Sequence, residues 1–147
     1  MSWMADWFWA APLVVLTVLA HSLALFAIRR RIVAVLSRYY DPRAFRLEFA
    51  VVMAITLLLI MALHASEAAV WAAVYVTIGA LPEFRLAMLY SLEAMTTYGH
   101  TEISLEPRWQ MMGAVEALNG LMLFGLTTAF LLWILQGATE VGRKRAD

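Results

Sequence analysis

The stretch that decides the fold of this chain is Thr96-Thr97-Tyr98-Gly99-His100-Thr101-Glu102-Ile103. It follows a short amphipathic segment and precedes a long apolar one. Non-helical backbone at membrane depth persists only where protein or a water-filled cavity covers its polar groups. A ring of such turns around a shared axis would form an ion filter, and this chain supplies one of them. The pattern therefore predicts that several copies of the chain assemble.

The composition is that of a polytopic membrane protein. Of the 147 residues, 63% are hydrophobic and 15% are charged, whereas a soluble domain carries about 25% charged residues. The chain has no cysteine, which excludes disulfides and thiol chemistry. We find no nucleophile with a base and an orienting group, no phosphate loop and no basic–aromatic patch. Neither an enzyme nor a nucleic-acid-binding protein is expected.

Three apolar segments are long enough to span a bilayer, which takes about 20 residues. They run approximately over Phe8–Ile28, Leu47–Leu81 and Trp109–Gln136. The second is too long for one upright crossing, so we expect a helix that is tilted or bent near His64. No basic residue precedes Arg29, which favours a spanning helix over a cleaved signal peptide.

The basic residues predict the topology. Nine of the eleven lie on one side of the predicted spans: Arg29, Arg30, Arg31, Arg38, Arg43, Arg46, Arg143, Lys144 and Arg145. The positive-inside rule makes that side cytoplasmic, with the N-terminus outside and the C-terminus inside. We also expect the Arg29–Arg46 connection to bind anionic lipid headgroups.

Between the second and third spans, Pro82 suits the first position of a helix. Residues Glu83 to Thr96 would then form a helix of about 20 Å, half a bilayer. Its C-terminal end carries negative dipole character and would stabilise a cation at the following turn. The alternative is an ordinary re-entrant or interfacial loop that conducts nothing.

Ser91 to Ile103 resembles the pore helix and filter of potassium channels, whose pattern is Thr-Thr-Val/Leu-Gly-Tyr-Gly-Asp-Ile. Aligned without gaps, four residues match that pattern: Thr96, Thr97, Gly99 and Ile103. The stretch Trp109–Phe130, with Glu116-Ala-Leu-Asn-Gly120, resembles the inner helix of small bacterial channels of the two-helix-pore group. The resemblance covers about residues 44 to 136.

The resemblance implies an all-α membrane protein with three transmembrane helices, a re-entrant pore half-helix and a filter loop, assembled as a homotetramer in the bacterial inner membrane. Residues 1–43 would form an N-terminal helix with its basic connection, 44–138 the pore domain and 139–147 a cytoplasmic tail. The expected ions are K⁺ or other monovalent cations, with no further cofactor. The implied ion-conducting residues are Thr96, Thr97, Tyr98, Gly99, His100 and Thr101.

The filter departs from the family pattern at Tyr98, His100, Thr101 and Glu102. Gly99 can take the left-handed backbone conformation that turns carbonyls toward one axis. Thr101 stands where the family has a second such glycine, and a β-branched residue is an outlier there. We therefore expect reduced or altered K⁺ selectivity. Four His100 side chains would lower the cation current at acidic outside pH.

Several polar residues accompany the filter or lie inside apolar segments. In a subset of potassium channels, the positions of Glu93 and Glu102 form a carboxyl pair that supports the filter, and the resemblance implies the same pair here. The alternative is that Glu93 faces a water-filled gap or the surface of the pore helix. His64 and Glu67 share a helix face, as do Glu116 and Asn119. The four are expected to form an interhelical hydrogen-bond network, which is favoured over a metal site made by His64, Glu67 and Glu116.

His21 and Gly120 also lie inside the apolar segments. His21, near Thr17, is expected to make a helix-packing hydrogen bond. Gly120 is either a close-packing residue or a gating hinge. The alternatives to a cation channel are a channel-like subunit that does not conduct and a proton- or metal-coupled transporter that uses His64, Glu67 and Glu116.

Overall fold

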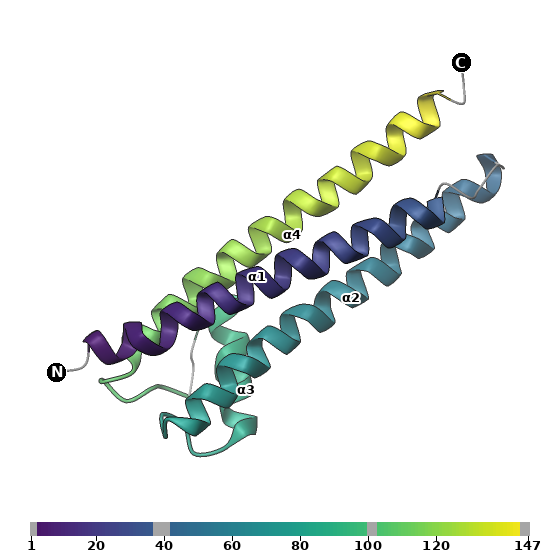
Figure 1. Ribbon diagram of the computed structural model, residues 1–147. Helices are drawn as coiled ribbons and strands as arrows, with labels where there is room; N and C mark the ends of the chain where they lie inside the picture. Colours follow the sequence, from purple (N-terminus) through teal and green to yellow (C-terminus); the bar gives the residue numbers. More distant parts are fainter. Residues whose placement is uncertain (1–2, 37–41, 100–102, 145–147) are drawn as a thin grey trace.

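The computed structural model describes residues 3–36, 42–99 and 103–144, and every regular element in those ranges is a helix. The four helices are α1 (Trp3–Leu36), α2 (Pro42–Thr77), α3 (Phe84–Met95) and α4 (Gln110–Lys144) (Figure 1). Three of them are long and apolar enough to cross a membrane, over Asp6–Val35, Leu47–Thr77 and Gln110–Gly137. The prediction of an all-α protein is confirmed for the described residues, and three helices suited to cross a membrane lie where the three spans were predicted.

The long helices exceed what one upright crossing needs. At 1.5 Å per residue, the 36 residues of α2 extend for about 54 Å, against a hydrocarbon core of about 30 Å. α2 passes through His64 as one continuous helix and ends at Thr77, four residues before the predicted Leu81.

The short helix begins later than predicted. Pro82 lies outside it, and Glu83 is its N-cap residue with φ −146° and ψ 153°. The prediction that Pro82 takes the first helical position is therefore wrong. The backbone at Glu83 is extended and not helical, so the first residue of α3 is Phe84.

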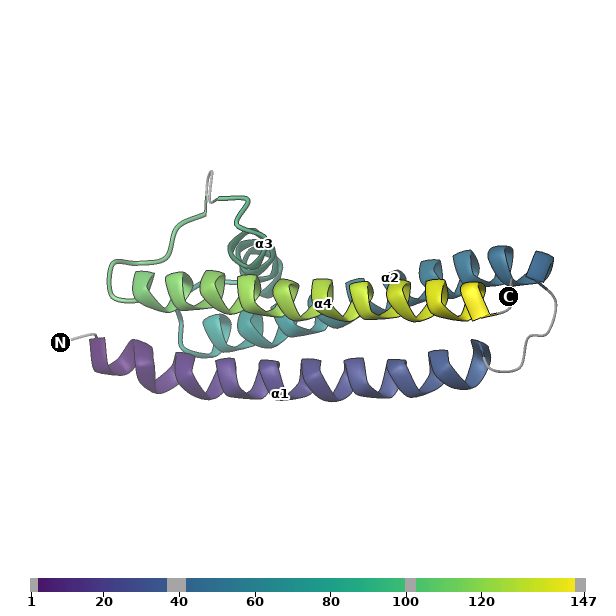
Figure 2. The same ribbon diagram turned by 90° about the horizontal axis from the view of Figure 1, so that it is seen from above.

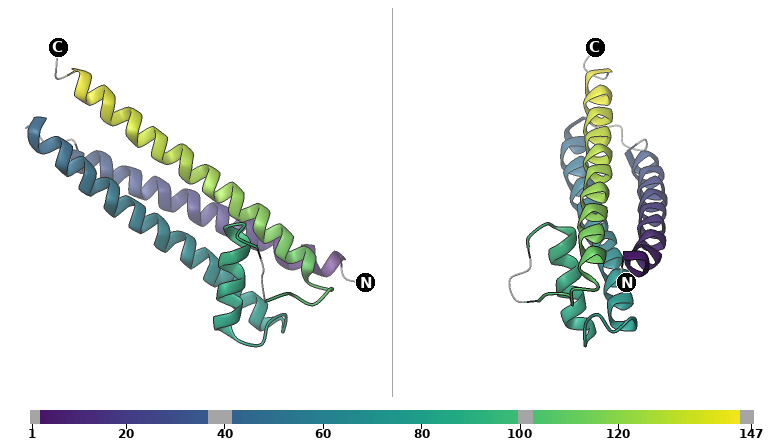
Figure 3. Two further views of the ribbon diagram at one scale, coloured as in Figure 1. Left: turned by 180° about the vertical axis from the view of Figure 1, so that it is seen from behind. Right: turned by 90° about the vertical axis from the view of Figure 1, so that its left-hand side faces the viewer.

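α1 and α3 lie on opposite sides of the pair formed by α2 and α4 (Figures 2 and 3). α1 packs on α4 and α2, while α3 packs on the C-terminal part of α2 and the N-terminal part of α4 (Figure 1). α1 and α4 run in the same direction and α2 runs in the opposite one (Figure 1).

The main core lies where α3 meets the other helices. Its fully buried residues include Trp71 and Tyr75 from α2, Ala87 from α3 and Met112 from α4. Ala10 of α1 belongs to the same cluster. Without a hydrophobic driving force in lipid, van der Waals packing of this kind holds membrane helices together. The core therefore fixes α3 against one end of the bundle.

Candidate functional site

The C-terminal end of α3 is closed by two backbone hydrogen bonds. The Thr97 N–H donates to the Ala94 carbonyl and the Tyr98 N–H donates to the Glu93 carbonyl, each at 3.1 Å. Thr97 itself has φ +56°. This is a Schellman motif, in which the residue after the C-cap takes the left-handed conformation.

The C-terminal end of α2 forms the same Schellman motif, with glycine, the usual residue, at the position that Thr97 takes in α3. The Gly79 N–H donates to the Val76 carbonyl at 3.1 Å, and the Ala80 N–H donates to the Tyr75 carbonyl at 2.8 Å. Gly79 has φ +71°. A residue with a Cβ in this conformation costs about 1–2 kcal/mol, and Thr97 is also β-branched. Strain of this kind at a single position is an observation from which function can be inferred.

The backbone beyond Thr97 keeps an unusual conformation. Gly99 has φ +93°, in the left-handed region as expected, whereas Tyr98 between them does not have a positive φ. Thr96, Thr97, Tyr98 and Gly99 are exposed, Tyr98 to 76%. Their backbone groups are therefore open to a ligand or to another chain.

Three of the predicted filter residues, His100, Thr101 and Glu102, lie outside the described residues. The expectation for the Glu93–Glu102 pair lies outside them too. Glu93 is half-buried in the last turn of α3.

Gly120 brings α4 against the backbone of α3. A Cβ at Gly120 would lie 2.6 Å from the Met95 Cα and would also collide with the Met95 carbonyl oxygen. Met95 is in turn buried between Ala68 of α2 and Leu123 of α4. The structure thus gives Gly120 a close-packing role, and the gating hinge stays a prediction.

One buried polar cluster lies beside α3. The Tyr75 hydroxyl donates to Glu116 Oε2 at 2.7 Å, and the Asn119 amide donates to the Thr17 hydroxyl at 2.9 Å. Glu116, Asn119 and the nearby Ser91 of α3 are all fully buried. This cluster joins α2 to α4 and α4 to α1.

A second buried cluster lies farther along the bundle and does not contain Glu116. His21 Nδ1 is 3.0 Å from Glu67 Oε1, and His64 Nδ1 is 3.4 Å from Glu67 Oε2. Thr127 Oγ1 lies 3.1 Å from His21 Nε2 and 3.2 Å from His64 Nε2. The four side chains form a closed ring that draws on all three long helices.

His21 makes hydrogen-bond contacts between helices, as expected, and its partners are Glu67 of α2 and Thr127 of α4. Thr17 accepts from Asn119 and donates to the Leu13 carbonyl at 2.9 Å, while His21 contacts Glu67. The sequence carries one sign of the contact between His21 and Glu67. Counted from Asp6, Thr77 and Gln110, which lie at the same end of the bundle, His21 is 15 residues inside its span, His64 is 13 and Thr127 is 17. Similar depths in neighbouring helices favour contact.

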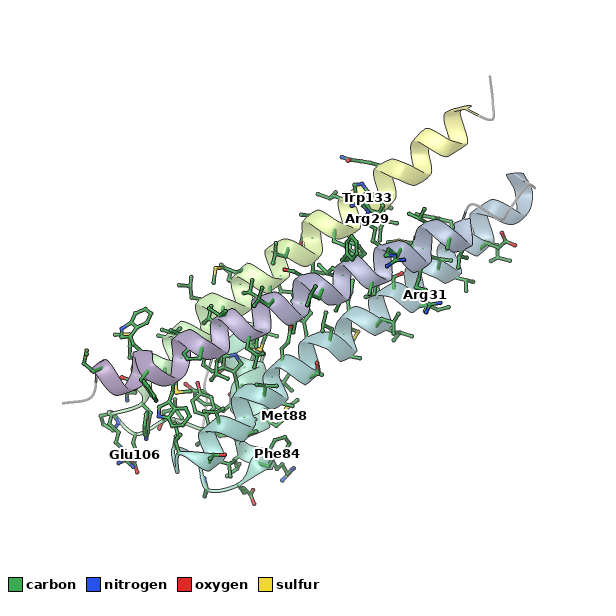
Figure 4. The ribbon with its side chains drawn as sticks, in the orientation of Figure 1. Arg29, Arg31, Phe84, Met88, Glu106 and Trp133 are labelled. Carbon is green, nitrogen blue, oxygen red and sulfur yellow. The ribbon has the colours of Figure 1, made fainter. Side chains whose placement is uncertain are left out.

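The opposite end of the bundle carries a cation–π contact. The Arg29 guanidinium lies 4.2 Å from the centre of the Trp133 ring, which joins α1 to α4 (Figure 4). Arg29 and Arg30 also line a shallow hollow of about 400 Å³ with Phe26 and Val33. These exposed guanidinium groups belong to the predicted lipid-headgroup region.

No protein-family model matches the chain, and neither a curated protein nor a solved structure shows significant similarity to it.

Proposed function

We propose that the chain forms a homotetrameric channel that conducts monovalent cations passively, with reduced or altered selectivity for K⁺. The observation that carries the proposal is the left-handed Thr97 at the end of α3. Glycine would close this helix with less strain, as Gly79 does at the end of α2. A strained threonine at an exposed helix end therefore favours a use for its hydroxyl and carbonyl oxygens, which are ligands for a hard cation.

The depth of α3 supports a role as a pore helix. Its last residue, Met95, meets α4 at Gly120, which is ten residues beyond the start of the apolar span at Gln110. Ten residues of helix extend about 15 Å, half of a hydrocarbon core of about 30 Å. In a bilayer, α3 would thus enter from one side and end near the middle.

The exposed turn supports assembly around a shared axis. Thr96 to Gly99 expose non-helical backbone at the depth just described. Such backbone is tolerated in a membrane only where protein or water covers it. Four copies around a water-filled axis would supply that cover, and the negative end of each α3 dipole would face the ions. In this arrangement the basic ends of the spans lie in the cytoplasm.

The Thr97→Gly variant tests the proposal because it separates stability from conduction. Glycine relieves the left-handed strain, so the free energy of unfolding should rise by about 1–2 kcal/mol. It also removes a ring of four hydroxyl ligands. The K⁺ flux into proteoliposomes should fall about tenfold, the equivalent of about 1.4 kcal/mol.

Gly79→Ala is the matched control, because it makes the opposite change in the same motif away from the turn. It should lower the free energy of unfolding and leave the flux per folded tetramer unchanged. An unchanged or higher K⁺ flux in Thr97→Gly would count against the channel, whatever its stability.

A further inference from the structure

The ring formed by His21, Glu67, His64 and Thr127 is short of protons. A neutral imidazole carries one N–H, a hydroxyl carries one O–H and an ionised carboxylate carries none. The two histidines and Thr127 therefore supply three protons for four contacts. At least one of the four contacts therefore brings two lone pairs together, either an Nδ1 atom against a Glu67 oxygen or an Nε2 atom against the Thr127 oxygen.

The geometry of the ring locates this shortfall at the contact between His64 and Glu67. His64 Nδ1 and Glu67 Oε2 are both buried without a hydrogen-bond partner, and they lie 3.4 Å apart. Two buried acceptors that face each other without a proton are costly. A cation between them would satisfy both lone pairs.

We propose that His21, His64 and Glu67 bind one divalent transition-metal ion of the zinc class between α1 and α2. Two imidazole nitrogens and a carboxylate are a ligand set that zinc accepts, with one position left open. Imidazole ligands also suit copper, nickel and iron. The proposal does not depend on ion conduction, and it departs from the expectation that the chain has no cofactor.

The separations fit such a site. Zinc lies about 2.0–2.2 Å from nitrogen and oxygen ligands, so tetrahedral geometry places neighbouring ligand atoms about 3.3–3.6 Å apart. One ligand atom from each of the three residues falls within 4.8 Å of the others, and the two nitrogen–oxygen pairs lie at 3.0 and 3.4 Å. Closing the set around an ion therefore needs only small side-chain movements.

Thr127 provides the outer support that histidine ligands need. Its oxygen lies within hydrogen-bond distance of both Nε2 atoms and can accept from both. Both Nδ1 lone pairs then turn toward Glu67. Ligating histidines commonly donate their second N–H in this way, which fixes ring orientation.

The surroundings shield the site and leave one side for entry. His21 is fully buried and the Glu67 side chain is 3% exposed, whereas the His64 side chain is 11% exposed. The Phe124 ring stacks on His64 with centroids 4.3 Å apart. The ion would connect α1 to α2 and, through Thr127, to α4.

Cobalt titration of the full-length protein in detergent tests the site directly. After chelator treatment at pH 8, Co²⁺ should produce the visible absorption of a four- or five-coordinate ion. The signal should saturate at one ion per chain, and Zn²⁺ should displace it. Absence of cobalt absorption and of bound zinc in folded wild-type protein would overturn the proposal, leaving a ring that holds a proton.

Variants locate the ion. His21→Gln and Glu67→Gln should each weaken Co²⁺ binding at least tenfold, and Thr127→Val by about 10–100-fold. Tyr75→Phe, in the separate Glu116 cluster, is the control and should bind as the wild type does. Equal binding by wild type, Glu67→Gln and Thr127→Val would refute the site. Thr127→Val removes no ligand and little volume, so it remains informative if a ligand variant does not fold.

Discussion

Gly120→Ala is the substitution whose effect follows most directly from the geometry. The new Cβ would lie 2.6 Å from the Met95 Cα, at least 0.8 Å short of the 3.4 Å at which ordinary contact begins. The atoms it meets are backbone, so no side chain can rotate away. α4 or the end of α3 must move, and overpacking of this kind costs about 1–3 kcal/mol.

Gly125→Ala on the same helix is the matched control. A Cβ at Gly125 meets nothing within 4 Å. Both substitutions gain up to about 1 kcal/mol of helix propensity, so the difference between the two variants isolates the clash. Gly120→Ala should be less stable than Gly125→Ala by about 1–3 kcal/mol.

The assay is equilibrium unfolding in mixed micelles, followed by far-ultraviolet circular dichroism, with both variants measured beside the wild type. In proteoliposomes, Gly120→Ala should also lower the K⁺ flux, because Met95 immediately precedes the Thr96 turn. Equal stability of the two variants would refute the close approach of α4 to Met95.

Two further substitutions test the interhelical contacts. Tyr75→Phe removes the donor to the fully buried Glu116 carboxylate, so it should lower the free energy of unfolding by about 1–3 kcal/mol; a loss below 0.5 kcal/mol in the same micelle assay would contradict the buried contact. Arg29→Ala removes the cation over Trp133 and should cost about 0.5–1 kcal/mol. It should also change the tryptophan emission spectrum, and an unchanged spectrum would argue against this contact.

The helices could be predicted from the sequence because the signals for them are local. Runs of about 20 apolar residues can be recognised without any knowledge of the partner helices. The first residue of α3 was harder to predict, because proline is common at the first position of a helix and Pro82 therefore suited that position. In the structure the backbone at Glu83 is extended, so Pro82 lies outside the helix; such boundaries depend on the conformation of the neighbouring residues.

The contacts of the candidate sites were harder to predict than the helices, because they depend on how the helices pack together. His64 and Glu67 could be paired by their spacing on one helix. His21 is 46 residues from Glu67, so their contact depends on how α1 packs against α2, and the similar depths of the two residues in their spans were the only sign of it in the sequence. Gly99 could be expected to take a positive φ because glycine does so freely. The positive φ of Thr97 could not, because local preference argues against it for a β-branched residue.

The measurement that tests the central proposal most directly is ion flux into liposomes that contain the purified protein. K⁺, Na⁺ and a large organic cation should be compared under the same gradient. The proposed function predicts flux of both small cations, with K⁺ and Na⁺ less separated than in a highly selective channel, and exclusion of the large one. No flux of either small cation through protein shown to be tetrameric would contradict the channel and favour a channel-like subunit that does not conduct.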